Sequence, residues 1–121
     1  MRILFALFLL LFATAASADA VSYYSFPDSI IVSIGNSKIV QLNLTLASEY
    51  EPRIYDNVKK HDLAIRGAIF DTLSAATELD FKIQNRLVLA EKICGIINQV
   101  LMNKVRFGGI KEVLITDIVV K

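Results

Sequence analysis

The chain of 121 residues is long enough for one domain, and it has no room for a second catalytic lobe or a bundle of membrane-spanning helices. Its 13 basic and 12 acidic residues give a formal net charge of +1, so the basic excess typical of a nucleic-acid-binding face is missing and no nucleic-acid partner is expected. Apolar residues make up 55% of the chain, above the ordinary share for a soluble domain, and the excess lies in the first 18 residues.

Met1–Ala18 has the pattern of a secretory signal peptide. A single arginine near the start is followed by an unbroken apolar run, Ile3–Phe12, and then by small residues. The last three leader residues fit the A-x-A rule, which predicts cleavage between Ala18 and Asp19. The alternative is a short uncleaved anchor, although the uncharged run is shorter than the ~20 residues of a comfortable membrane span. Both interpretations place the rest of the chain outside the cytoplasmic membrane.

A β-hairpin is predicted after a lead segment of polar and aromatic residues that spans positions 19–28. Ser29–Ile34 is rich in β-branched residues and favours a strand. Gly35-Asn36 is a two-residue turn signal. Ile39–Leu46 alternates between apolar and polar residues, which predicts a strand with one buried face.

A first helix is predicted to begin near Pro52 and to run to about Leu73. The residues from Ser48 to Glu51 have the S-x-x-E form of a capping box, and a proline in the first turn costs no helical hydrogen bond. Apolar residues fall on one stripe of this helix, and Gly67 is its internal weak point. The stripe consists of Ile54, Val58, Ile65 and Ile69.

A second helix is predicted to begin between Thr77 and Lys82, with Asp80 as a candidate capping residue. Its expected buried stripe is Ile83, Leu87, Ala90, Cys94, Ile97 and Leu101, and further apolar residues flank this stripe on one side. The apolar arc therefore covers about half of the helix circumference, more than one sheet needs. Either the first helix or another subunit is expected to cover the remainder.

The last strand is predicted over Ile110–Val120, after the loop that ends with Gly108-Gly109. We expect Val113, Ile115 and Val119 on one face and Leu114 and Ile118 on the other. A strand that is apolar on both faces is expected inside a sheet and not at its edge. The order β-β-α-α-β predicts a two-layer α+β sandwich that forms a single domain over residues 29–121.

Residues with catalytic or metal-binding chemistry are scarce. His61 is the only histidine, and its charged neighbours favour a structural or solvated role over a place in a catalytic triad. Cys94 is the only cysteine, so no internal disulfide can form, and its apolar neighbours favour burial as a small hydrophobic residue. One histidine and one cysteine do not supply a usual zinc ligand set, so neither a metal nor another cofactor is expected. The inventory favours a binding or scaffolding domain.

The order of these segments resembles the periplasmic domain of the flagellar basal body-associated FliL family. The similarity covers about Pro27 to Lys121. It is carried by the two hairpin strands, by the helical segment Leu63–Ser74, by a Leu-Glu-Ile-Asn-Leu pattern and by the closing strand Val113–Lys121. In the chain, that pattern consists of Leu87, Glu91, Ile97-Asn98 and Leu101.

The resemblance implies a fold similar to the stomatin/prohibitin domain, which tends to form rings. It implies a non-enzymatic scaffold in the periplasm, associated with the inner membrane and the basal body. As partners it implies other copies of the chain and the peptidoglycan-linking subunit of the flagellar stator, with the membrane reached only through neighbours or an uncleaved leader. Arg66 and Asp117 are our candidates for partner-binding residues.

Two other functions stay open on the sequence. One is an exported monomeric binding or inhibitor module with a hairpin-plus-helix fold. The other is a small exported hydrolase, which would depend on His61.

Overall fold

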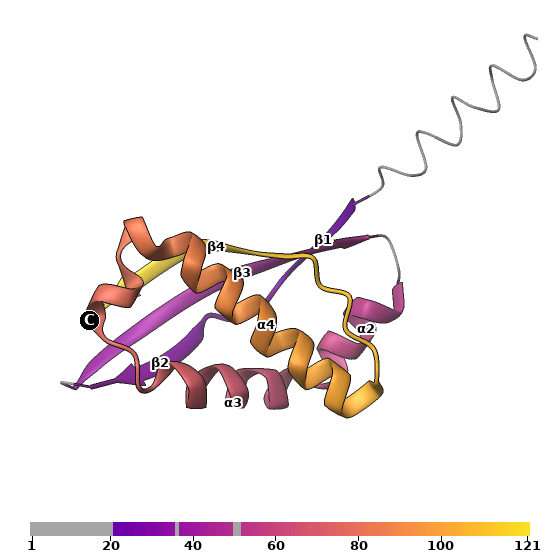
Figure 1. Cartoon of the computed structure of the whole chain (residues 1–121), viewed down its shortest axis with the longest axis horizontal. Helices are drawn as coiled ribbons and strands as arrows, with labels where there is room; N and C mark the ends of the chain where they lie inside the picture. The colour runs from indigo at the N-terminus through magenta and orange to yellow at the C-terminus, as the bar shows by residue number, and fades with distance from the viewer. Residues whose placement is uncertain (1–20, 36, 50–51) are drawn as a thin grey trace, which may run out of the picture.

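A computed structural model describes residues 21–35, 37–49 and 52–121. Within these residues a four-stranded antiparallel sheet is covered on one face by helices (Figure 1). This is the predicted α+β arrangement, in which a hairpin precedes the helices and the last strand returns to the sheet. The leader and the predicted cleavage site between Ala18 and Asp19 lie outside the described residues.

The central strand β3, Lys38–Glu49, organises the sheet. Strands β1, Val21–Ser25, and β2, Ile30–Ile34, pair one after the other along one edge of β3, and β4, Glu112–Val120, pairs along the other edge. The predicted hairpin is confirmed, with residues 35–37 between the strands where a two-residue turn was expected. Asn36, the second residue of the predicted turn, lies outside the described residues. Strand β1 was not predicted, because its polar and aromatic residues show no clear alternation.

Strand β4 lies at the edge of the sheet, and the prediction that it lies inside is wrong. Among the described strands it pairs only with β3. Under strict alternation the apolar residues of β4 fall on both faces of the strand. A β-bulge adds one residue and so changes which residues share a face. The register shifts between Asn43 and Leu44 of β3, opposite Thr116 and Asp117, and the Thr116 hydroxyl donates a hydrogen bond of 3.1 Å to the Asn43 carbonyl oxygen.

The bulge changes which residues of β4 face the helices. Before the bulge, Val113 and Ile115 are buried; after it, Ile118 and Val120 pack against the same core. The expected grouping of Val119 with Val113 and Ile115 is therefore wrong. The extra residue reverses the alternation and gives β4 one core-facing side along its whole length.

The predicted first helix is two helices, α2, Pro52–Lys60, and α3, Asp62–Leu73. The interruption is at His61, not at the expected weak point Gly67, whose surroundings leave open space. The four residues of the predicted stripe are all buried. Their phase survives because hydrogen bonds still join residues four apart on both sides of His61.

Ser48, the first residue of the predicted capping box, belongs to β3 and not to a helix. Its hydroxyl is buried and donates a hydrogen bond of 2.9 Å to the Tyr55 hydroxyl, which in turn donates to the carbonyl oxygen of Ser22 at 2.6 Å. The side chain thus connects β3 with α2 and β1. The box's other member, Glu51, lies outside the described residues.

The second long helix, α4, spans Arg86–Val105 and begins later than predicted. Two short 3₁₀ helices precede it, η1, Glu78–Phe81, and η2, Ile83–Asn85. Asp80 was expected to cap this long helix; instead it caps η1, where its carboxylate accepts a hydrogen bond of 2.9 Å from the Thr77 amide.

The predicted buried stripe of α4 is partly wrong. Ile83 is 81% exposed and Leu87 is 79% exposed. Ile83 lies in η2, where the period of 3.6 residues does not apply. The residues of α4 that are buried are Leu89, Ala90, Ile93, Ile97 and Leu101, and Cys94 is half-buried. Two of these five buried residues, Leu89 and Ile93, flank the predicted stripe, so the buried face of α4 is turned toward that side.

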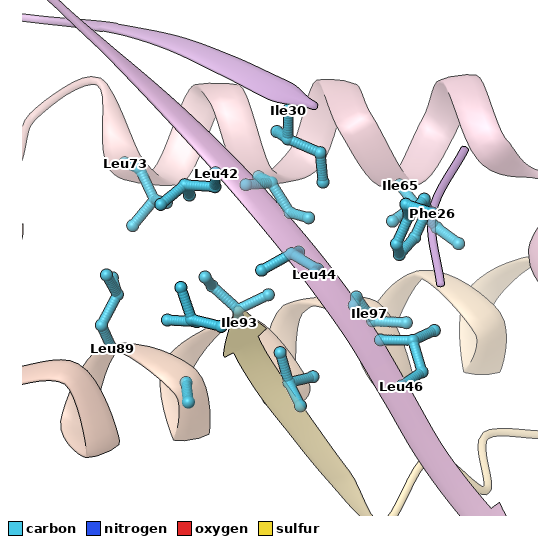
Figure 2. Packing of buried hydrophobic residues seen from close by; sticks show 14 of the residues in the cluster. Phe26, Ile30, Leu42, Leu44, Leu46, Ile65, Leu73, Leu89, Ile93 and Ile97 are labelled. Atoms are coloured by element: carbon cyan, nitrogen blue, oxygen red, sulfur yellow. The ribbon is translucent and has the colours of Figure 1, made fainter. Parts of the chain in front are cut away.

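The core lies between the sheet and helices α3 and α4. Alternate residues of β3 point from the sheet toward isoleucines and leucines of both helices, and Phe26 closes one side of the cluster (Figure 2). The core-facing residues of β3 are Val40, Leu42, Leu44 and Leu46, all at most 2% exposed.

Truncation of a central core residue should destabilise the domain strongly. Ile97 is fully buried, and Ile97→Ala should lower the free energy of unfolding by about 2–5 kcal/mol, because it removes apolar contacts and leaves a cavity. The matched control is Leu63→Ala on α3, where the side chain is 85% exposed and the change should stay within about 0.5 kcal/mol. Urea denaturation measures both; equal effects would contradict this packing.

Candidate functional site

An exposed row of large apolar side chains follows the chain from η1 into the first turn of α4, and we call it the apolar ridge. It consists of Leu79, Ile83, Leu87 and Val88, which are 60%, 81%, 79% and 67% exposed. Soluble domains expose single apolar residues routinely, but several within ten positions mark a candidate contact with another molecule. The sequence contained this signal, but we interpreted Ile83 and Leu87 as core residues because their spacing fits a helix.

A groove of about 470 Å³ lies between α4 and the beginning of β4. Leu87 of the apolar ridge forms part of its wall, so the ridge and the groove adjoin. Small residues of α4, among them Ala90 and Gly95, leave the space open. Its walls come from α4 and from residues 110–113 at the beginning of β4, and no residue of β3 lines it.

Asn98 of α4 fastens the chain that leads into β4. Its side-chain amide donates a hydrogen bond of 2.9 Å to the Ile110 carbonyl oxygen, and its side-chain oxygen accepts one of 3.0 Å from the Ile110 amide. Gly108 passes so close that an added Cβ would lie 3.1 Å from the Asn98 oxygen. Gly109 has φ of +108°, and an added Cβ there would lie 3.0 Å from Ile54. The two glycines therefore let the loop pass tightly against α2 and α4.

Cys94 lies in the groove, one turn before Asn98. Its thiol is half-buried, and its Sγ lies 3.5 Å from the carbonyl oxygen of Ile110. Burial raises the pKa of the Cys94 thiol, and the negative charge of Glu112 raises it further. A raised pKa keeps the thiol protonated and poorly nucleophilic, so the side chain acts as part of the wall.

Arg66 is engaged within the domain. Its Nε donates a hydrogen bond of 2.8 Å to Asp62 one turn earlier, and its two terminal nitrogens donate to the carbonyl oxygens of Ser29 and Asp28 at 3.1 and 3.3 Å. The guanidinium also lies 5.4 Å from the centre of the Phe26 ring. Arg66 thus fastens α3 to the connection between β1 and β2.

Asp117, the other predicted partner-binding residue, is exposed on β4 beside the bulge. It pairs in register with Asn43 on the sheet face that turns away from the helices. The structure therefore does not bring Arg66 and Asp117 together into one site.

His61 lies at the junction of α2 and α3. Its Nε2 is buried and has no hydrogen-bond partner within the described residues. Among residues 21–35, 37–49 and 52–121 no three histidine, cysteine or acidic side chains gather to hold a metal ion. None of the helices in this part of the chain is long and apolar enough to cross a membrane.

Comparison with protein families gives a match that spans most of the described residues. The family model described as "Flagellar basal body-associated protein FliL" matches residues 23–120, which include most of β1, the other three described strands and both long helices of the sandwich. No curated protein matches the chain. The matched range begins within β1, the strand that the sequence patterns did not predict.

Removal of the Asn98 side chain should loosen the entrance to β4. Asn98→Ala leaves the Ile110 amide and carbonyl without their side-chain partners, which should cost about 1–3 kcal/mol of stability. Hydrogen exchange should show faster exchange of the Ile110 amide. Gln99→Ala, on the exposed side of the same helix turn, is the control and should leave that amide protected. Unchanged exchange in Asn98→Ala would contradict the assigned contact.

Proposed function

Because the chain belongs to the FliL family of flagellar basal body-associated proteins, we propose that it is a non-enzymatic periplasmic scaffold that braces or regulates the flagellar stator. The observation that carries the proposal is the family match across nearly the whole described domain. The domain's exposed features support contact with another protein: an apolar ridge and an adjoining groove.

The position of the apolar ridge favours a protein partner. The segment that carries the ridge, from η1 to the start of α4, lies toward the opposite end of the domain from the start of β1 (Figure 1). If the leader is kept as an anchor, it joins the domain at the end where β1 starts, and the ridge is presented at the other end. This arrangement suits a scaffold whose partner extends away from the membrane, such as the peptidoglycan-linking subunit of the stator.

The two candidate partner-binding residues, Asp117 and Arg66, differ in how much of the side chain a partner can reach. Asp117 is exposed and free to serve as a partner contact on the outer face of the sheet. Arg66 keeps about a fifth of its side chain exposed while its nitrogens contact Asp62, Ser29 and Asp28. A contact with a partner at Arg66 would add to this internal role.

Substitution of the apolar ridge should impair motility without unfolding the domain. The double variant Ile83→Glu with Leu87→Glu places two charges where apolar contact with a partner is proposed, and both side chains are exposed in the domain. We expect reduced swimming in viscous medium, where stator engagement limits the motor, and a change in stability within about 0.5 kcal/mol per site.

The matched control for the ridge variant is Leu63→Glu, an equally exposed leucine on α3 outside the ridge. This control should swim like the wild type. Normal swimming of the ridge variant at normal protein level would contradict the role of the ridge, and equal loss in both variants would contradict its specificity.

Export of the chain is the second testable part of the proposal. If Met1–Ala18 is a cleaved signal peptide, N-terminal sequencing of protein recovered from the periplasm should begin at Asp19. The substitution Ala18→Leu should block cleavage, because the A-x-A rule needs a small residue there. Recovery of the intact leader on the wild-type protein would contradict cleavage and favour the anchor.

A further inference from the structure

The main-chain groups along one side of β4 have no partner strand within the described residues. Lys121 and Ile39 exchange two hydrogen bonds, of 2.8 and 3.1 Å, so the main-chain groups of Lys121 face β3. Alternation along an antiparallel strand then turns the groups of Val120 and Ile118 away from β3. A free edge of this kind is a template for another strand.

The same orientation continues beyond the bulge. The Phe26 amide donates to the Leu44 carbonyl oxygen at 3.1 Å, so Leu44 directs its main-chain groups toward β1 and β2. Ile115, the register partner of Leu44, therefore stands in a non-hydrogen-bonded pair and directs its own groups to the free edge. The same holds for Val113, two residues earlier.

The free edge of β4 is complementary to itself under two-fold symmetry. If Thr116 of one copy lies opposite Asp117 of the other, antiparallel pairing joins Ile115 with Ile118 and Val113 with Val120. All four residues have outward-directed main-chain groups and core-facing side chains, so both the hydrogen bonds and the faces agree. A two-fold interface requires this reciprocity, since each residue pair occurs twice.

The bulge makes this agreement possible. Without the extra residue, Ile115 and Ile118 would lie on opposite faces of β4, and the self-paired strand would set core-facing residues against solvent-facing ones. With it, the only outward apolar pair is Leu114 with Val119.

The charges at the ends of the strand agree with the same register. Glu112 of one copy lies opposite Lys121 of the other, so two opposite-charge pairs flank the apolar centre of the interface. A shift by two residues in either direction breaks this match.

The groove beside β4 gives the second copy's strand a place to pack. It is lined by Val113, the residue that would pair with Val120 of the second copy, and by the small side chains of α4. Ile118 and Val120 are only partly buried in one copy. In the paired arrangement they would enter the partner's groove and be covered there.

We propose that two copies of the chain join through their β4 strands, antiparallel and centred between Thr116 and Asp117, to form one continuous sheet. The interface does not depend on the proposed role at the stator, and its test measures the contact between copies directly.

Disulfide cross-linking in cells tests the register. In the full chain with Cys94→Ala, the variant Leu114→Cys with Val119→Cys places the two sulfurs opposite each other in a non-hydrogen-bonded pair. Such pairs have Cα atoms roughly 4.5 Å apart, close enough for a disulfide. Mild oxidation should convert most of this variant to a covalent dimer on a non-reducing gel.

The matched control is Leu114→Cys with Asp117→Cys, also on the outer face of β4 but in a register shifted by two residues. It should give at least tenfold less covalent dimer. Absence of dimer from both variants, or equal amounts from both, would overturn the proposal.

Charge exchange gives an independent measurement on the same chain. Glu112→Lys and Lys121→Glu should each weaken dimerisation about tenfold in sedimentation analysis, because each creates two like-charge pairs. The double variant restores both pairs with reversed sign and should recover the wild-type affinity. Failure of the double variant to recover, with its melting temperature unchanged, would overturn the assigned register.

Discussion

The structure depends on the alternation of β3. This twelve-residue strand sends every second side chain into the core and holds β1, β2 and β4 by its main-chain groups on two edges. Its apolar side chains meet both long helices, so helix packing and strand pairing are set by the same residues. The loop fastened by Asn98 and the bulge in β4 then adjust the last strand to this fixed central strand.

Periodicity predicted the parts of the fold that have one buried face. The alternation of Ile39–Leu46 and the stripe that begins at Ile54 were correct because in each case a single face packs against the core. Prediction failed where the period itself changes. A bulge reversed the alternation of β4, and two 3₁₀ helices broke the phase before α4, so Ile83 and Leu87 were assigned to the core. Neither change leaves a local sequence signal that identifies it.

The candidate site was less accessible to prediction than the fold. The apolar half-circumference of α4 was visible in the sequence, and it correctly indicated more apolar surface than one sheet covers. Which half faces outward was decided by tertiary packing, since α3 and the sheet cover Leu89, Ile93 and Ile97 and leave Leu87 and Val88 exposed. The groove beside β4 could not be predicted, because it requires the edge position of that strand.

The surfaces of the domain that are candidates for contact with another molecule lie near α4 and β4. They are the apolar ridge, the adjoining groove and the main-chain groups on the outer edge of β4. The chain belongs to a family of flagellar basal body-associated proteins, and a role for it at the stator is our proposal. The most direct test counts labelled stator units in motors under high load in cells that lack the gene. The account predicts fewer engaged units and lower torque than in the wild type, restored by the intact gene. Wild-type torque with unchanged stator occupancy would contradict it.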